Sequence, residues 1–196
     1  MKLYIAAVSG NSYKPRILLA LLNVPYETVM IDLGRQQQKE GWYRKVNPRG
    51  EVPALEDDEV ILWDSGACLV YIARKYGGDA WLPAMAGPMA EVMQWMALAA
   101  SEIQFGLQYA RRGVLQGRWT AGTLEQGQAI GRIALGVMED RLRDHEWLAL
   151  DRPTVADIAC FPYTETAPEA KVSLEPYPAI AAWHARCRAL PGWPVR

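Results

Sequence analysis

Hydrophobic and polar positions follow two patterns in the first part of the chain. Short apolar or β-branched runs predict strands, and longer segments flanked by turn and capping residues predict helices. The order is strand, helix, strand, then two strands and a helix, which predicts a mixed four-stranded sheet with helices, βαβ followed by ββα. The expected strands are Leu3–Ala7, Tyr26–Ile31, Pro53–Glu56 and Val60–Trp63; the expected helices are Tyr13–Leu22, a short one at Trp42–Val46, and one from Asp64 to Ala73 or Tyr76.

Strand signals end near residue 78, and helical periodicity replaces them. The segments Pro88–Gly113 and Ala121–Leu142 predict helices that pack on one another. Further helices are expected from Thr154 and from Pro178 to Leu190. The expected contact residues are Val92, Trp95, Met96 and Ala99 in the first segment and Ile130, Ile133, Ala134 and Val137 in the second.

These patterns divide the chain into an α/β domain (residues 1–78), a Gly- and Pro-rich linker (residues 79–87) and an all-helical domain (residues 88–196). Thr154 and Asp157 have the spacing of a capping box, so we interpret both as structural. Ser12 is the expected N-cap of the first helix, and Pro15 lies in the first turn, where a missing N–H is tolerated.

Composition narrows the class of protein without selecting a function. The 196 residues are 51% hydrophobic and 22% charged with a net charge of −1, which is typical of a globular protein and not of a nucleic-acid or membrane-surface binder. No segment has the length of a membrane span. Cys68, Cys160 and Cys187 are far apart and the chain has two histidines, so neither a disulfide framework nor a zinc site is expected. We expect Cys68 and Cys160 in the core, Cys187 at the surface, and the protein in the cytoplasm.

Ser9 and Asn11 lie between the first expected strand and the first expected helix. A helix N-terminus favours an anion there, and a hydroxyl could donate a hydrogen bond to a thiolate and lower its pKa. The alternative is that these residues only form a turn and cap the helix.

Two further segments have candidate binding residues. A cis Val52-Pro53 bond would direct the main chain of Val52 toward a peptide-like ligand, which could pair with it as an added strand, although most X–Pro bonds are trans. Asp64 and Ser65 at a helix start could bind the ammonium and carboxylate of an amino acid, or could simply cap the helix.

Four segments, SGNSYKPRILLALL, NPRGEVPALEDDEVILWDSGACLVYIARKYG, PTVADIA and YPAIAAWHARCRALPGW, together resemble the cytosolic glutathione transferases, in particular bacterial members with a serine active site. The resemblance covers almost the whole chain. It implies a thioredoxin-like N-terminal domain, an all-helical C-terminal domain, glutathione as co-substrate and a homodimer.

The resemblance also implies roles for individual residues. Ser9 matches the serine that activates the glutathione thiol, and Asn11 falls where some members use an asparagine near the sulfur. Val52 matches the residue whose main chain pairs with glutathione, and Pro53 matches the cis-proline. Asp64 and Ser65 match the pair that holds the γ-glutamyl group, while Lys39 or Gln38 could approach the glycyl carboxylate.

Departures from the family pattern bear on the mechanism. Tyr4 and Tyr13 are misplaced for a tyrosine-type enzyme, and no cysteine lies in residues 1–20. Glu51 stands where many relatives have glutamine, and its charge could repel the carboxylates of glutathione.

The leading hypothesis is a transferase that conjugates glutathione to a small hydrophobic electrophile held by the helical domain, with Phe105, Tyr109 and Arg112 as candidate contacts. The alternatives are a glutathione-dependent disulfide or peroxide reductase, and a non-catalytic binding module of the same fold.

Overall fold

The computed structural model describes residues 1–117 and 119–195 and divides into two compact units. The first unit contains residues 1–79 and 191–195, and the second contains residues 80–190. The sequence-based division placed residues 191–195 with the helical domain, but their contacts are with the first unit. The Tyr13 hydroxyl donates a hydrogen bond of 2.7 Å to the carbonyl of Pro194, and Gly192 lies against the main chain of Ala20.

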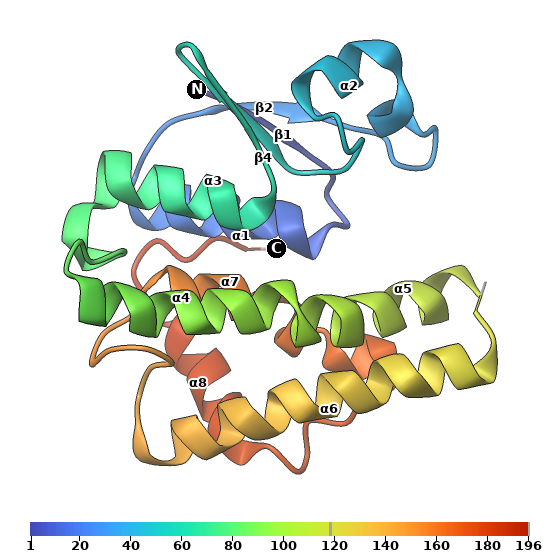
Figure 1. The fold of residues 1–196 in the computed structure, drawn as a ribbon, viewed down its shortest axis with the longest axis vertical. Coiled ribbons are helices and arrows are strands. Elements are labelled where there is room, and N and C mark those ends of the chain that lie inside the picture. Colours follow the sequence, from blue (N-terminus) through green and yellow to red (C-terminus); the bar gives the residue numbers. More distant parts are fainter. Residues whose placement is uncertain (118, 196) are drawn as a thin grey trace. The chain divides into compact units, whose positions relative to one another are not determined.

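The first unit is built on one mixed sheet with the strand order β2-β1-β3-β4 (Figure 1). β1 pairs in parallel with β2 and antiparallel with β3, and β3 pairs antiparallel with β4. This is the thioredoxin-like βαβ–ββα arrangement that the resemblance implied. The strands are β1 (Lys2–Ile5), β2 (Glu27–Met30), β3 (Ala54–Asp57) and β4 (Val60–Trp63).

The two faces of this sheet bury different side chains because successive strand residues point in opposite directions. Tyr4 and Ala54 belong to a cluster with Ile31 and Tyr43 from the segment that includes helix α2 (Gly41–Val46). The opposite face is covered by helices α1 (Gly10–Leu21) and α3 (Ser65–Ile72), which pack against each other (Figure 1). A 3₁₀ turn, η1 (Gln37–Lys39), precedes α2.

Helix α1 begins earlier than the sequence pattern predicted. Its N-cap is Ser9, whose side chain accepts a hydrogen bond from the main-chain N–H of Ser12. The prediction of Ser12 as the cap is therefore wrong. Ser12 lies inside the helix, and its buried hydroxyl accepts a hydrogen bond from the N–H of Ala6. Either serine satisfies the sequence rule for a cap, and only the path of the chain after β1 selects Ser9.

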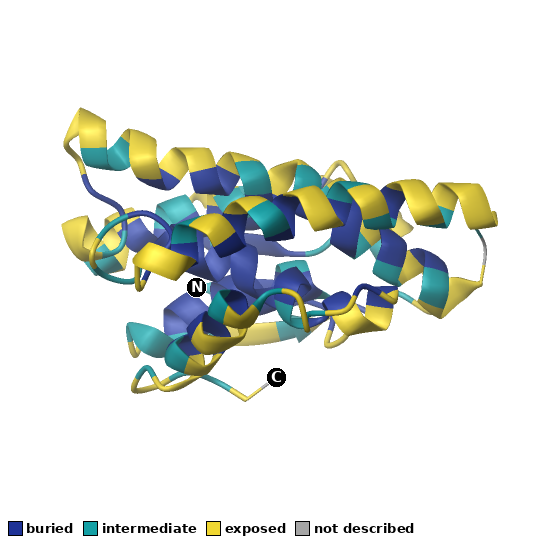
Figure 2. Cartoon of the chain, turned by 90° about the horizontal axis from the view of Figure 1, so that it is seen from below, coloured by how far each residue is buried: buried dark blue, intermediate teal, exposed yellow. Residues whose placement is uncertain are grey.

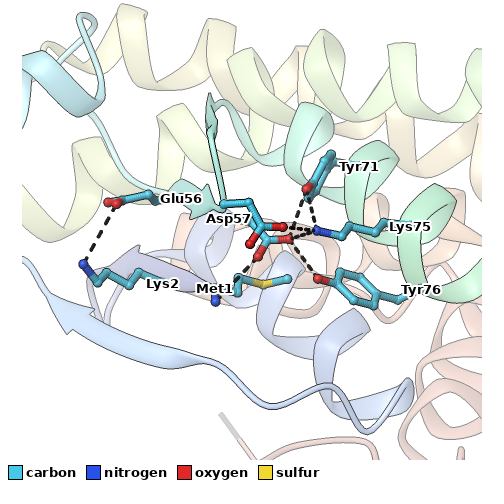
Figure 3. Close-up of polar contacts among 8 residues, drawn as sticks. Met1, Lys2, Glu56, Asp57, Tyr71, Lys75 and Tyr76 are labelled. Atoms are coloured by element: carbon cyan, nitrogen blue, oxygen red, sulfur yellow. Dashed lines mark hydrogen bonds and ion pairs between the residues drawn. The ribbon is translucent and has the colours of Figure 1, made fainter.

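The far end of the β3–β4 hairpin is tied to the end of α3 by Asp57 (Figure 3). A π-helical turn, η2 (Ala73–Gly77), follows α3. Tyr71 near the end of α3 and Tyr76 in η2 both donate hydrogen bonds to Asp57, as does Lys75 at 2.7 Å. Burial alone would raise the pKa of Asp57, but these hydrogen bonds outweigh it and hold the pKa at about 2.

The second unit is helical, and its longest described connections are residues 145–154 before α7 and residues 171–177 before α8 (Figure 1). The segment predicted as one helix over Pro88–Gly113 is two helices with a π-helical turn between them. α4 starts at Ala86, inside the segment predicted as a linker. The elements after the 3₁₀ turn η3 (Gly78–Ala80) are α4 (Ala86–Ala100), η4 (Ile103–Gln108, the π turn), α5 (Tyr109–Gln116), α6 (Ala121–Asp144), α7 (Val155–Glu165), η5 (Ala167–Ala170, 3₁₀) and α8 (Pro178–Arg188).

The two longest helices, α4 and α6, are each buried along one face and exposed along the other, whereas α7 is buried on all sides (Figure 2). The predicted contact face of α4 is confirmed, since all four residues named for it are buried. The predicted face of α6 is correct only at Ala134, which is fully buried, because Ile133 is 60% exposed and Val137 is 48% exposed. Glycine explains the difference. A Cβ on Gly106 would lie 2.4 Å from the nitrogen of Gly131, so the backbones of η4 and α6 approach along a glycine face that an apolar pattern does not show. The buried residues of α6 are Gly127, Gly131, Ala134, Leu135, Met138, Glu139 and Leu142.

Buried carboxylates accept hydrogen bonds at the starts of α7 and α8. Thr154 and Asp157 form the expected capping box of α7, and Asp157 also accepts hydrogen bonds from the N–H of Leu148 and the indole of Trp183. Burial raises the pKa of Asp157, although these hydrogen bonds act in the opposite direction. The buried carboxylate of Glu139 accepts from two main-chain N–H groups at the start of α8. These residues are structural.

Candidate functional site

Ser9 combines two properties of its hydroxyl group at the start of α1. The oxygen accepts the 3.2 Å hydrogen bond from the N–H of Ser12 that caps the helix. A hydroxyl has one donor hydrogen besides its acceptor lone pairs, so this bond leaves the hydrogen of Ser9 to be donated. The two interpretations of Ser9 from the sequence, helix cap and thiol activator, therefore do not exclude each other, because one uses the oxygen as an acceptor and the other uses the hydrogen.

The starts of α1 and α3 meet through Asn11 and Ser65. The Ser65 hydroxyl donates a hydrogen bond of 3.4 Å to the side-chain oxygen of Asn11. These residues are 54 positions apart in sequence, and the packing of α1 against α3 brings them together. The positive ends of two helix dipoles therefore lie at one place, where they favour anionic groups.

Asp64 caps α3 with an unusual backbone conformation. Its Oδ1 accepts hydrogen bonds from the N–H groups of Gly66 (2.8 Å) and Ala67 (3.3 Å). Its φ of 80° lies in the region that favours glycine, which costs a non-glycine residue roughly 1–3 kcal/mol. The side chain remains half exposed, with Oδ2 on the side of Arg49. Because backbone strain of this kind is concentrated at ligand-binding and active sites, Asp64 remains a candidate binding residue.

Val52 precedes a cis peptide bond to Pro53, as the resemblance implied. Among residues 1–117 and 119–195, no hydrogen bond engages the main chain of Val52. An extended ligand could therefore pair with it in the manner of an added strand.

The loop before Val52 is held by two buried donors that the sequence pattern did not single out. The hydroxyl of Tyr43 and the side-chain amide of Asn47 both donate hydrogen bonds of 2.7 Å to the carbonyl of Glu51. Both residues are buried, Tyr43 in the cluster beneath the sheet and Asn47 at the end of α2. The polar residue Asn47 at the start of the NPRGEVP segment could have suggested a structural hydrogen bond. Its acceptor could not be predicted, because every residue has a main-chain carbonyl and the sequence does not show which one is used.

Lys39 and Gln38 lie beside the same loop. The ammonium group of Lys39 donates a hydrogen bond of 3.4 Å to the carbonyl of Arg49, and its side chain is exposed. The side-chain oxygen of Gln38 is buried without a hydrogen-bonding partner in the described part of the chain. The carbonyl of Gln38 and the side chain of Lys39 are thus near the segment that leads into Val52, and Lys39 supplies a positive charge there.

Cysteine and tyrosine side chains have other surroundings. Cys68, Cys160 and Cys187 are all buried, so the expectation of an exposed Cys187 is wrong; it lies on the inner face of α8. Burial raises the pKa of Cys68 to about 12. Tyr4 donates to Glu56, and burial together with this bond raises its pKa to about 12. The hydroxyl hydrogens of Tyr4 and Tyr13 are therefore both used in hydrogen bonds within the first unit, to Glu56 and to the carbonyl of Pro194.

Within the described residues, no group of histidine, cysteine, aspartate and glutamate side chains has a metal-binding arrangement. In the same residues, no helix has the length and apolar character needed to cross a bilayer.

The residues proposed to contact an electrophile form a cluster of their own in the second unit. The rings of Phe105 and Tyr109 lie 5.9 Å apart, and Tyr109 lies 4.8 Å from Trp119. The guanidinium of Arg112 lies over Tyr109 at 5.7 Å. Phe105 is 57% exposed, so the cluster presents an aromatic surface rather than a closed core.

Comparison with known proteins identifies the family. The model of the glutathione S-transferase N-terminal domain matches residues 1–74, and that of the C-terminal domain matches residues 124–191. A glutathione S-transferase from Pseudomonas fluorescens has 30% identity, covers 99% of this chain and 97% of its own, and superimposes with a TM-score of 0.93. The chain belongs to the glutathione S-transferase family.

Relatives within this family have different activities. A maleylpyruvate isomerase from Ralstonia is 29% identical over 97% of this chain and 93% of its own. A glutathione transferase homologue from Lodderomyces elongisporus, whose crystal structure has two GSH per subunit, is 25% identical, with 97% and 94% of the two chains covered and a TM-score of 0.89. Membership of the glutathione S-transferase family therefore leaves the reaction to be argued from the site.

Proposed function

We propose that this protein binds glutathione on its first unit and conjugates it to a small hydrophobic electrophile. The main chain of Val52 pairs with the cysteinyl part of glutathione, and Lys39 attracts the glycyl carboxylate. Asp64 binds the ammonium of the γ-glutamyl group, and Ser65 with the adjacent N–H groups binds its carboxylate. Two observations support this placement: the hydrogen bond between Ser65 and Asn11 joins the starts of α1 and α3, and the main chain of Val52 has no hydrogen bond within the described residues.

Thiol activation is the step that Ser9 performs in this proposal. Its hydroxyl donates a hydrogen bond to the glutathione sulfur, which favours the thiolate and lowers the pKa of the thiol. The N-terminus of α1 adds its positive dipole. The thiolate then attacks the electrophile, a new C–S bond forms and the leaving group departs with its electron pair. The single observation that carries the proposal is that capping leaves the hydrogen of Ser9 to be donated.

The second unit supplies the electrophile contacts in this proposal. Phe105 and Tyr109 offer exposed aromatic faces, and Arg112 lies over one of them. Such a surface suits a flat aromatic electrophile, because aromatic rings favour stacked or edge-on contacts.

The experiment is an ultraviolet difference spectrum of protein with glutathione at about pH 6.5, where a thiol with a pKa of roughly 8.5 is almost entirely protonated. A saturable thiolate band that Ser9→Ala abolishes supports the mechanism. A thiolate band that persists in Ser9→Ala contradicts the role of Ser9. Absence of glutathione binding at millimolar concentration points to a non-catalytic module of the same fold.

A glutathione-dependent disulfide or peroxide reductase is the second candidate. Two observations favour it: Asn11 lies at the shared start of α1 and α3, and the Lodderomyces homologue has two GSH per subunit. Because the cysteines are buried, such a reaction would use two glutathione molecules and no enzyme thiol. Faster turnover of a mixed disulfide of glutathione than of a chloronitroarene would favour this candidate.

We also propose that the protein forms a homodimer, with the helices that begin at Ser65 and near Pro88 as the contact region. Light scattering after size-exclusion chromatography tests this directly. A mass near the 21.9 kDa of one chain would contradict the dimer.

A further inference from the structure

Arg49 lies between two carboxylates that come from different parts of the first unit. Its guanidinium is 3.2 Å from Oε2 of Glu51 and 4.0 Å from Oδ2 of Asp64. It also lies over the ring of Trp63 at 5.8 Å. Arg49 thus joins the loop before Val52 to the start of α3.

The backbone of Arg49 is held in place, so its side chain starts from a fixed position. Its N–H donates to the side chain of Asn47, and its carbonyl accepts from Lys39. The next residue, Gly50, has a φ of 60°, and a Cβ there would lie 2.7 Å from the carbonyl of Gln38. Glycine is therefore required at residue 50 for this path of the loop.

Charge is the reason that this arrangement matters. Glutathione has two carboxylates and one ammonium group, and its activated thiolate adds another negative charge. Asp64 is needed for the ammonium, whereas the carboxylate of Glu51 adds repulsion with no ligand group to bind. With Arg49 present, the two protein carboxylates are partly neutralised by one cation.

We propose that Arg49 is a specificity-determining residue of the glutathione site, whose guanidinium offsets the charge of Glu51 so that the site accepts a peptide thiol with two carboxylates. This proposal rests on the proposed function. It also accounts for the glutamate at position 51: the chain carries its own counterion two residues away. Both side chains are about half exposed, so the effect is moderate and depends on ionic strength.

The test measures binding of S-methylglutathione, which cannot react, by calorimetry at about 20 mM and about 500 mM salt, where the Debye lengths differ several-fold. Arg49→Met should weaken binding about three- to fivefold at low salt, the range of an exposed ion pair, and less at high salt. The double variant Arg49→Met with Glu51→Gln should recover most of this affinity, because it restores the net charge of the site.

Two variants serve as matched controls. Arg35→Met removes another exposed arginine of the first unit, which pairs with Asp32 at 3.6 Å, and it should leave binding within twofold of wild type. Glu59→Gln makes the same substitution as Glu51→Gln in the exposed turn of the β3–β4 hairpin, and it should not rescue Arg49→Met.

A second peptide distinguishes the effect of the charge of Arg49 from a role of Arg49 in shaping the loop. The glycyl methyl ester of S-methylglutathione has one carboxylate fewer, so Arg49→Met should weaken its binding less than it weakens binding of the parent peptide. Equal losses for both peptides, without rescue by Glu51→Gln, would show that Arg49 only shapes the loop and would overturn the proposal. Unchanged binding in Arg49→Met would also overturn it. Failure of the wild type to bind either peptide would instead reject the proposed function itself, and the inference with it.

Discussion

The hydroxyl oxygen of Ser9 lies 3.2 Å from the main-chain nitrogen of Ser12 and caps helix α1 with a hydrogen bond that it accepts. The same side chain is the proposed donor to the glutathione sulfur. A substitution of Ser9 therefore affects both folding and chemistry, and the two effects must be separated by the choice of variant.

Ser9→Gly and Ser9→Ala separate them. Both variants lose the donor hydrogen, so conjugation should fall to a small fraction of wild type in both while glutathione affinity changes little. An N-cap serine replaced by alanine costs about 0.5–2 kcal/mol, and replaced by glycine only a few tenths. Initial rates with a chloronitroarene and urea unfolding check the two effects. Activity that follows stability across the pair would contradict a chemical role for Ser9.

Removal of the Tyr43 hydroxyl should weaken the glutathione site without touching the ligand. In Tyr43→Phe the carbonyl of Glu51 loses one of its two hydrogen bonds, a change of about 0.5–1.5 kcal/mol in stability. Val52 is then held less firmly, so we expect a higher KM for glutathione with a nearly unchanged kcat. Tyr4→Phe is the matched control, because the hydroxyl of Tyr4 donates to Glu56 instead. An equal rise of KM in both variants would rule out a specific role for Tyr43.

Asp57 should contribute to acid sensitivity at low pH. An unfolded aspartate has a pKa near 3.9, and the folded pKa of Asp57 is about 2. A depressed folded pKa gives stability that is present above pH about 4 and is lost as the pH falls toward about 2. Asp57→Asn should be less stable than wild type at pH 7 and should lose less further stability below pH 4. Urea unfolding at several pH values measures this.

Asp58→Asn is the control for Asp57→Asn. Asp58 also contacts Lys75, at 3.0 Å, but its side chain is 81% exposed. We expect little change in its stability or in its pH dependence. A loss as large as that of Asp57→Asn would show that the contact with Lys75, and not the burial of Asp57, decides the effect.

His184 should destabilise the second unit on mild acidification. Its ring lies 2.9 Å from the hydroxyl of Thr164, and burial, with a smaller effect of Arg188, lowers its pKa to about 3. An unfolded histidine has a pKa near 6.5, so between about pH 6.5 and 3 the unfolded chain binds a proton that the folded chain does not. The free energy of unfolding therefore falls as the pH decreases through this range.

His184→Gln tests this because glutamine cannot bind the proton. The variant should show a flatter dependence of unfolding free energy on pH between about 6.5 and 4, measured by urea unfolding. His145→Gln, at an exposed position, should keep the slope of wild type. A wild-type slope in His184→Gln would refute the assignment to His184.

Local patterns in the sequence predicted much of the fold and indicated the candidate site residues, whose roles stay predictions. Periodicity and capping rules describe features that depend on neighbours within a few positions. These features are the order of strands and helices along the chain, the capping box at Thr154 and Asp157, and the buried face of α4. The buried face of α6 escaped these rules, because it is set by the contact of Gly106 with Gly131 on another element. The predicted exposure of Cys187 is wrong for a similar reason, since its burial depends on the packing of α8 and not on its neighbours in sequence.

By itself, the sequence determined that the chain has an α/β part followed by a helical part, and which segments carry polar residues at helix starts. Only the tertiary structure decided that Ser9 rather than Ser12 caps α1, that Ser65 reaches Asn11, and that Arg49 lies between Glu51 and Asp64. The physical reason is that propensity and capping act between near neighbours, whereas these contacts join residues that only packing of the sheet, α1 and α3 brings together. The pairing of Arg49 with Glu51 and Asp64 at the proposed glutathione site therefore depends on the fold, although the sequence supplies each charged residue.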